Sequence, residues 1–271
     1  MPRLGLTPFA AFLLGLYGFA PLAAAQAVPD FSGHWGRAGL FRFEPPSSGP
    51  GPVVNTSRFA DTVERVGDYT NPILTQKSAR IVKERGDLQL AGANFPDPRN
   101  QCRLEPPPFI LGLEFEILFE QRPDVIDIVY VYGHQHRRIR MNASHPANLT
   151  PTAYGDSVGR WEGDTFVVES SGYDDRSWLD RGANQRNPQR RQAGIPHSDE
   201  LKIVERYKRL NYGLLQLDMT ITDPKVFTAP WHSGPNTIAL RPDSELGENI
   251  CVPSDNAEYY NRSQIPAEAN K

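Results

Sequence analysis

The stretch Gly155-Asp-Ser-Val-Gly-Arg-Trp-Glu-Gly-Asp-Thr-Phe-Val-Val-Glu-Ser-Ser-Gly172 predicts the fold of this chain. Gly163 lies between Glu162 and Asp164, where a glycine supplies the positive φ that tight hairpin turns need. The residues that follow the turn, Thr-Phe-Val-Val, are β-branched or aromatic and pack well on a pleated surface. The stretch therefore predicts a β-hairpin over residues 155–172.

Segments on both sides of this hairpin also have the pattern of strands. Residues 109–120 alternate apolar with polar or acidic side chains, which is the period of a strand with one buried face. Further strands are expected at residues 125–132, 133–141, 200–209, 214–222, 226–231 and 237–240. About nine strands in successive hairpins favour a mainly β fold, either an antiparallel lipocalin-like barrel or a strongly curved sheet.

One segment, residues 73–90, has the apolar spacing of a helix. Thr75 is its expected N-cap, and Gly86 is its expected end. Residues 45–72 are rich in Pro, Gly and Ser and predict an extended loop. Residues 173–196 are polar and carry several arginines, which predicts a mobile, solvated loop.

The N-terminus has the features of a signal peptide over residues 1–27. Arg3 supplies a positive charge, and residues 9–20 form an apolar run too short to span a bilayer. Small residues follow, with a cleavage site expected after Ala25 or Ala27. The remaining residues, 28–271, suit a single β-rich domain. We therefore expect an exported, periplasmic protein that is not inserted in the membrane after cleavage.

Net charge bears on the class of partner, and the cysteine content bears on disulfide bonding. The formal net charge is −3, and this mild acidity argues against a nucleic-acid or anionic-membrane partner. The chain has two cysteines, Cys102 and Cys251, which in an oxidising compartment are most simply one disulfide. Two buried thiols are the alternative.

Short motifs in a fixed order resemble those of a large family of exported bacterial β-rich proteins. The motifs are Asp30-Phe-Ser-Gly-His-Trp, Arg138-Ile139 followed by His145-Pro146, the hairpin stretch, Pro196-His-Ser-Asp-Glu-Leu, Val204-Glu-Arg-Tyr, Ile221-Thr-Asp-Pro, Ala229-Pro-Trp and Glu248-Asn-Ile-Cys. The resemblance implies a periplasmic β-barrel-like fold and no particular activity. Gly33-His34-Trp35 is also similar to the opening signature of lipocalin-like barrels, in which the Trp plugs one end. Residues 184–195 depart from the family pattern as an insertion, and Val-Glu-Ser-Ser stands where the family more often has Val-Asp-Thr.

His197 is the first candidate for chemistry. It follows a polar loop and precedes a strand, close in sequence to Asp199 and Glu205. A His near carboxylates can act as a general acid or base near neutral pH, whereas a hydrogen-bonding role at the strand start is the alternative. Glu205 shares strand parity with apolar residues, so we expect its carboxylate on a buried face, compensated by Arg138, Arg206 or a similar donor.

Three functions stay open at this point. The first is a small-molecule-binding barrel for a mostly apolar or aromatic ligand. Its candidate ligand-binding residues are Trp35, Tyr130, Arg138, Trp161, Tyr207 and Trp231. The second is a cofactor-free acid/base enzyme (an isomerase, lyase or hydrolase) that uses His197, Glu205 and Asp199 in the same pocket. The third is an envelope protein whose long loops contact a partner.

Metal and cofactor sites are not expected. His134 and His136 could ligate a metal from one face of a strand, but no familiar metal motif completes them. The sequence has neither a phosphate-binding glycine loop nor a dinucleotide fingerprint.

Overall fold

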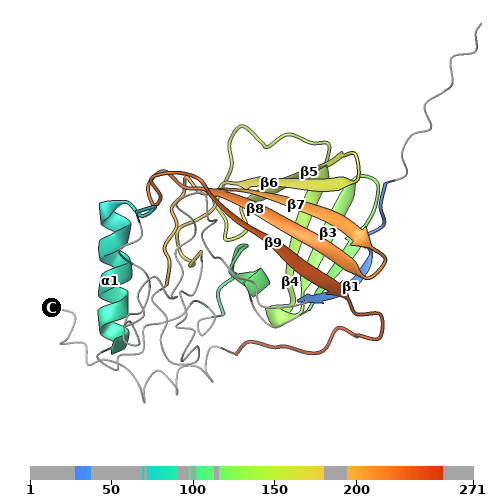
Figure 1. Ribbon diagram of the computed structural model, residues 1–271, viewed down its shortest axis with the longest axis horizontal. Helices are drawn as coiled ribbons and strands as arrows, with labels where there is room; N and C mark the ends of the chain where they lie inside the picture. Colours follow the sequence, from blue (N-terminus) through green and yellow to red (C-terminus); the bar gives the residue numbers. More distant parts are fainter. Residues whose placement is uncertain are drawn as a thin grey trace, which may run out of the picture.

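Nine β-strands close into a barrel in the computed structural model of the protein (Figure 1). The structure describes residues 28–37, 69, 72–90, 98, 102–112, 116–179 and 194–252. The predicted signal peptide, residues 1–27, lies outside these ranges, as do most of the predicted loops at 45–72 and 173–196. None of the helices in the described ranges is long and apolar enough to cross a membrane.

The strands follow one another around the barrel in chain order, and β1 pairs with β9 to close it. Their bounds are β1 (Gly33–Arg37), β2 (Ile117–Gln121), β3 (Val125–Tyr130), β4 (Gln135–Met141), β5 (Asp156–Glu162), β6 (Thr165–Ser171), β7 (Lys202–Asn211), β8 (Leu214–Thr222) and β9 (Trp231–Leu240). The predicted mainly β barrel with one helix is confirmed.

One neighbouring pair, β4 and β5, is parallel, with Ile139 opposite Ser157. The expectation of a purely antiparallel barrel is wrong at this pair. A closed ring of nine strands needs such a parallel pair. Each antiparallel pair reverses the strand direction, and the ring returns to its starting direction only after an even number of reversals. Residues 142–155 connect the two strands in place of a tight hairpin turn.

The predicted hairpin at residues 155–172 is confirmed as β5 and β6. Glu162 lies opposite Thr165 across the turn, and Gly163 has the positive φ of +63° that the sequence requires there. The predicted hairpin of residues 200–222 is also confirmed, as β7 and β8. Apolar and polar residues alternate regularly in β7 and β8, whereas β5 and β6 each have three consecutive buried residues.

Three strand predictions are wrong in part. Residues 109–120 begin with the short 3-10 helix η2 (Ile110–Gly112), so the strand starts only at Ile117. Residues 226–230 form a turn with an isolated bridge from Phe227 to Leu74, and only Trp231 of the expected strand 226–231 lies in a strand. That strand is β9, which includes the expected strand at 237–240 and in which Gly234 and Pro235 form a bulge opposite β8. A bulge is where a strand tolerates a proline, because its missing N–H leaves no ladder bond unmade.

The predicted helix is α1 (Gln76–Leu90), which lies beside the barrel (Figure 1). Its N-cap is Thr75 as expected, because the Ser78 backbone N–H donates to the Thr75 hydroxyl over 3.3 Å. The predicted end at Gly86 is wrong, since the helix continues to Leu90. Backbone hydrogen bonds tie the start of α1 to the β8–β9 connection, among them Thr75 N–H to the Val226 carbonyl over 2.9 Å.

An aromatic cluster fills the end of the barrel where the β5–β6 and β7–β8 turns lie. Phe31 packs edge-on against Phe119, Trp161 and Phe166, with ring centroids 5.3–6.3 Å apart. Trp35 on β1 is fully buried, and its indole N–H donates to the Phe31 carbonyl over 2.8 Å. Apolar packing therefore closes this end.

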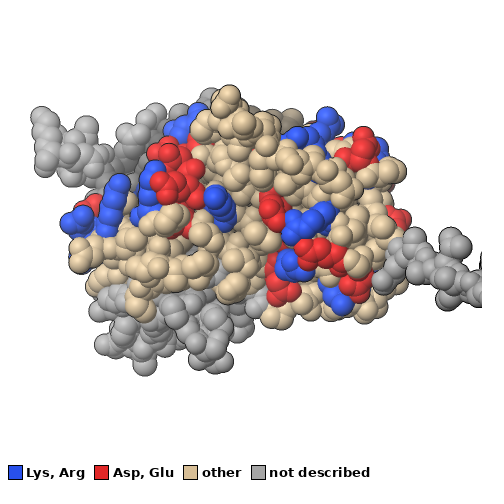
Figure 2. Space-filling view, turned by 90° about the horizontal axis from the view of Figure 1, so that it is seen from above, with Lys and Arg blue, Asp and Glu red and all other residues tan. Residues whose placement is uncertain are grey.

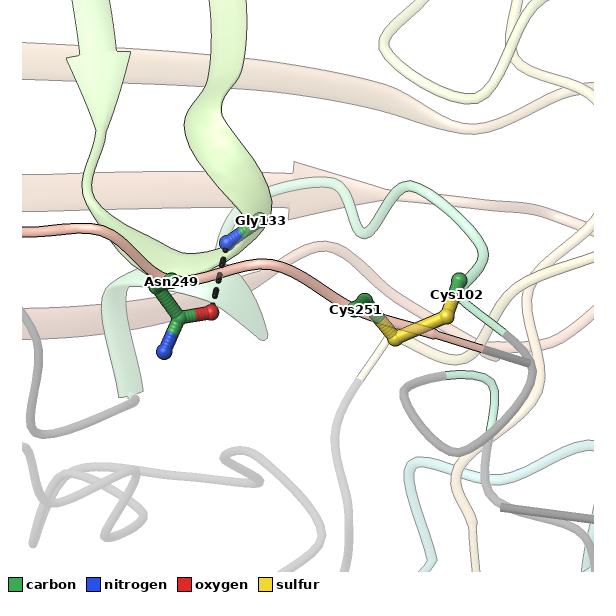
Figure 3. Close-up of a disulfide and its surroundings, with 4 residues drawn as sticks. All are labelled: Cys102, Gly133, Asn249 and Cys251. Atoms are coloured by element: carbon green, nitrogen blue, oxygen red, sulfur yellow. Dashed lines mark hydrogen bonds between the residues drawn. A yellow bond between two sulfur atoms is a disulfide. The ribbon is translucent and has the colours of Figure 1, made fainter. Parts of the chain in front are cut away.

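The disulfide between Cys102 and Cys251 is confirmed and joins two segments outside the sheet (Figure 3). The segment after β9 runs back to the β3–β4 connection, which contains the short 3-10 helix η3 (Tyr132–His134). There the Asn249 side chain accepts a hydrogen bond from Gly133 N–H over 3.0 Å (Figure 3). The bridge thus links residues 102–112 to a chain end that is itself fixed to the barrel.

Two glycines with the same backbone conformation predict different costs of substitution. Gly155 and Gly163 have φ values of +62° and +63°, but a Cβ at Gly155 would lie 2.4 Å from the Ser171 carbonyl oxygen, whereas one at Gly163 meets nothing within 4 Å. Gly163→Ala is expected to cost about 1 kcal/mol of unfolding free energy through its backbone conformation. Gly155→Ala should cost about 3 kcal/mol or more, because the backbone must also move. Urea unfolding measures both, and equal losses would contradict this account.

Candidate functional site

A buried ion pair crosses the interior of the barrel. Arg137 on β4 and Glu205 on β7 both point inward, and their side chains are 1% and 0% exposed. Arg137 Nη1 donates to Glu205 Oε1 over 3.1 Å and Nη2 donates to Oε2 over 2.5 Å. The pair is therefore bidentate, the geometry in which a guanidinium and a carboxylate bind most strongly.

Two serines and a tyrosine complete this network. Arg137 also donates to Ser157 on β5 over 3.0 Å and to Ser170 on β6 over 2.7 Å, and the two serine hydroxyls lie 2.8 Å apart. The Tyr207 hydroxyl donates to Glu205 Oε1 over 2.7 Å. Every nitrogen of the guanidinium thus has a hydrogen bond, which offsets much of the cost of burying the charge.

The Glu205 carboxylate stabilises the charged form of Arg137 and the neutral form of Tyr207. Burial alone would lower the pKa of Arg137, but the Glu205 carboxylate, together with Tyr130 and Tyr173, outweighs it and holds that pKa well above the usual value. Burial, together with the nearby Glu205 charge, raises the pKa of Tyr207 well above its usual value. Arg137 is therefore a cation and Tyr207 a neutral donor at any physiological pH.

Two further tyrosine hydroxyls lie near this pair. Tyr130 on β3 and Tyr173, just after β6, are buried, and among the described residues neither hydroxyl has a hydrogen-bond partner. Burial raises the pKa of Tyr130 to about 12 and raises that of Tyr173 as well, while the Arg137 charge opposes both shifts. The close approach of the Arg137 side chain to Tyr130, and of the Ser170 side chain to Tyr173, opposes them further without the geometry of a full hydrogen bond. Both hydroxyls are thus neutral donors that feel the same ion pair.

A second polar group lies beside Tyr130 on the inner face of β4. The Gln135 side-chain oxygen accepts from the Tyr154 hydroxyl and from the backbone N–H of Glu105, the latter over 3.1 Å. The Tyr154 ring stacks on that of Tyr130, with centroids 6.0 Å apart and planes 7° apart. Residues 102–112, which the disulfide fixes, therefore pack against the tyrosine side of the interior.

His197 lies at the same end of the barrel as Tyr173. Its Nε2 is 2.9 Å from the Ser177 hydroxyl, and its Nδ1 is 3.3 Å from the Ser198 carbonyl oxygen. Because a carbonyl only accepts, Nδ1 carries the proton and Nε2 accepts from Ser177. Its ring packs edge-on against that of Tyr173, with centroids 6.3 Å apart. The hydrogen bonds of His197 and Glu205 thus go to different partners, and their acid/base pairing stays a prediction.

Two predicted site residues lie on the outer surface. Arg138 is 61% exposed and pairs with Asp127, which it meets over 3.1 Å. Asp199 is also exposed and pairs with Lys225 over 2.5 Å. The expected donor to Glu205 is therefore corrected from Arg138 or Arg206 to Arg137, because strand alternation turns neighbouring residues to opposite faces.

Exposed acidic and basic side chains are interspersed on this outer surface, as Figure 2 shows for one face. Arg206 pairs with Glu162 over 2.6 Å, and Arg160 pairs with Glu162 over 2.7 Å. Such exposed pairs are worth less than about 1 kcal/mol each. Their arrangement leaves the outer sheet face with charges of both signs.

The other predicted ligand-binding residues divide by position. Tyr130 and Tyr207 face the interior beside the ion pair. Trp35 and Trp161 belong to the aromatic end of the barrel. Trp231 begins β9, and its side chain lies outside the described part of the chain.

Sequence reasoning missed Arg137, Ser157, Ser170 and Tyr173. The three residues on strands share the inward parity of their apolar neighbours: Arg137 alternates with the buried Ile139 and Met141. That shared parity was the signal in the sequence that could have placed these three side chains inside the barrel.

The two candidate metal ligands have other partners. His134 Nε2 is 3.0 Å from the Gly247 carbonyl oxygen, and His136 Nε2 is 2.8 Å from Asp127. Within the ranges that the structure describes, no three His, Cys, Asp or Glu side chains form a group that could hold a metal ion.

Comparison with known protein families finds no family model that matches the chain, and comparison with curated proteins finds no match either.

Replacing one partner of the ion pair should destabilise the barrel strongly. Arg137→Met leaves the Glu205 carboxylate buried without its cation, at an expected cost of about 3–5 kcal/mol of unfolding free energy. The double variant Arg137→Met/Glu205→Leu buries no charge and should recover most of that loss. Arg138→Met, one residue away on the outer face, is the control and should cost much less, because its partner Asp127 keeps Arg122 and His136. Urea unfolding measures all three, and equal losses in the two single variants would refute the role of the pair.

His197 should make stability depend on pH. Burial lowers its pKa from 6.5, while Ser198, Asp223, Asp174 and Asp175 oppose that shift. The unfolded chain therefore binds more protons at mildly acidic pH, so this contribution to stability is present above about pH 6.5 and is lost as the pH falls toward the folded value.

Replacing His197 tests that contribution. His197→Gln should reduce the loss of unfolding free energy between pH 7.5 and 5.5 by about 1 kcal/mol. The exposed His232→Gln variant is the control and should keep the pH dependence of the unchanged protein. An unchanged slope in His197→Gln would contradict the assignment.

Proposed function

We propose that this protein is a small-molecule-binding barrel that holds a mostly apolar or aromatic ligand beside Tyr130 and Tyr173. The observation that carries the proposal is the pair of buried hydroxyls that make no hydrogen bond of good geometry among the described residues, although Arg137 approaches one and Ser170 the other. A buried polar group left unpaired costs about 1–3 kcal/mol, so two near one ion pair are a marked exception to the pairing of the rest of the network. A ligand atom that accepts from them would recover that cost.

The surroundings favour an apolar ligand body. Tyr130 shares the inward row of β3 with Ile126 and Ile128, both fully buried. Val168 on β6 and Ile203 on β7 flank the Ser170 and Glu205 positions on the same inner surface. Ligand sites commonly combine such apolar walls with a few placed polar groups.

Export to the periplasm is part of the proposal. The segment at residues 1–27 has the charge, apolar run and small residues of a signal peptide. The disulfide between Cys102 and Cys251 is consistent with an oxidising compartment.

The acid/base enzyme and the envelope interaction protein remain alternative predictions. Three hydrogen bonds, from Arg137 and Tyr207, already occupy the Glu205 oxygens. A carboxylate held in this way is better suited to fix an arginine than to take a proton from a substrate. This favours binding over proton transfer at that residue.

Native mass spectrometry of protein purified from the periplasm of a Gram-negative host tests the proposal. We expect a mature chain without residues 1–25 or 1–27 that carries one small molecule, or that binds one molecule of the apolar probe N-phenyl-1-naphthylamine. Ile128→Phe enlarges an inward side chain beside Tyr130 and should lower the bound fraction about tenfold or more. Val129→Phe, on the outer face of the same strand, is the control and should keep it.

Two results would overturn the proposal. One is an unchanged protein that carries no small molecule and binds no probe. The other is equal loading of the two variants, with circular dichroism showing both folded, because an interior site cannot be indifferent to the size of an inward side chain.

A further inference from the structure

We propose that the polar group of the ligand is an uncharged hydrogen-bond acceptor, such as a ketone or amide carbonyl, that accepts from the hydroxyls of Tyr130 and Tyr173. This inference rests on the proposed binding function and adds the chemical class of the ligand. Its basis is the distribution of charge and hydrogen bonds around the two hydroxyls.

The buried arginine is not available to a ligand anion. Its Nη1 and Nη2 bind Glu205, while its Nε and Nη2 bind Ser157 and Ser170. Its charge is already matched by the carboxylate it holds. A ligand carboxylate placed beside the tyrosines would therefore be repelled by Glu205, while the guanidinium charge that could offset its desolvation is already paired with that residue.

Binding of a cationic ligand group is not favoured either. Glu205 Oε1 accepts from both Arg137 and Tyr207, and Oε2 accepts from Arg137. An ammonium group approaching the carboxylate would also approach the guanidinium, which carries the same charge. The pair thus presents little net charge to the interior, and neither sign of ligand is favoured.

The two hydroxyls are suited to donate. Burial, which is the main cause, keeps the pKa values of Tyr130 and Tyr173 above their usual range, so both stay protonated. Each hydroxyl offers one proton and two lone pairs. Four of the five N–H groups of the neighbouring guanidinium already have acceptors, so most of the unmet hydrogen-bonding capacity of the site lies in the hydroxyl protons.

Both rings are held in place before any ligand arrives. Tyr130 stacks on Tyr154 with centroids 6.0 Å apart, and Tyr173 packs edge-on against His197 with centroids 6.3 Å apart. Each hydroxyl also senses the charges of Arg137 and Glu205, and that of Tyr173 senses Tyr130. Donors whose rings are fixed in advance lose little entropy on binding an acceptor, which favours a carbonyl.

Three probes that share a naphthalene body separate the possibilities. They are 2-acetylnaphthalene, the shape-matched hydrocarbon 2-isopropenylnaphthalene and the anion 2-naphthoate. Titration of the folded, mature chain should give a dissociation constant for the ketone about tenfold or more below those of the other two, as expected when buried donors would otherwise stay unpaired. The infrared carbonyl stretch of the bound ketone should lie below its value in hexane, because hydrogen bonds weaken that bond.

The double variant Tyr130→Phe/Tyr173→Phe tests the two donors. It should bind the ketone no better than the hydrocarbon while hydrocarbon binding is kept. Tyr212→Phe is the control, since that side chain is 79% exposed, and it should preserve the preference for the ketone. If the double variant does not fold, the infrared shift in the unchanged protein decides the matter.

The outcomes distinguish this inference from the function on which it rests. Equal binding of ketone and hydrocarbon, preference for the naphthoate, or a carbonyl stretch at its hexane value would overturn the inference and leave the binding function in place. Failure of all three probes and of N-phenyl-1-naphthylamine to bind would overturn both.

Discussion

The ion pair between Arg137 and Glu205 constrains the whole barrel. Two charges removed from water are tolerated only while they keep each other and their hydrogen bonds. A shift of one residue in the register of β4 or β7 would turn one partner to the outer face and leave the other buried alone. The pair therefore stabilises one register specifically, whatever its net contribution to the free energy of unfolding.

This network lies where the barrel has no tight turn to set the register of two neighbouring strands. Its members Arg137, Ser157, Ser170 and Glu205 lie on four successive strands, β4 to β7. They span the parallel pair β4–β5, the neighbours that residues 142–155 join without a tight turn to set their register. Outside the barrel, Arg140 and His145 both contact Asp156 at the same junction, over 2.8 and 2.6 Å. Side chains thus fix a register that a hairpin would fix elsewhere.

Local pattern was enough to predict the hairpins, the helix cap at Thr75 and the inward position of Glu205, because each depends on residues near in sequence. It did not predict the parallel pair, since a strand has the same alternation in either direction. Nor did it separate Arg137 from Arg138. Residues 136–138 and 140 are basic on both faces of β4, so their polarity does not tell which of them face the interior. Only the pairing of β4 with β3 and β5 determines that. Tyr173 follows the end of β6, where no strand periodicity could place it.

The disulfide holds a segment outside the sheet against the interior of the barrel. Residues 102–112 contribute the buried Pro106–Leu111 run and the Glu105 N–H that binds Gln135, beside the stacked rings of Tyr130 and Tyr154. Cys102 ties this segment to Cys251, and Asn249 ties that chain end to Gly133. A loop of this length closed by one bridge is stabilised by about 5 kcal/mol in the chain-entropy account. Oxidation therefore holds in place the segment that packs over the tyrosine end, so the condition that forms the bridge also shapes the surroundings of the two hydroxyls.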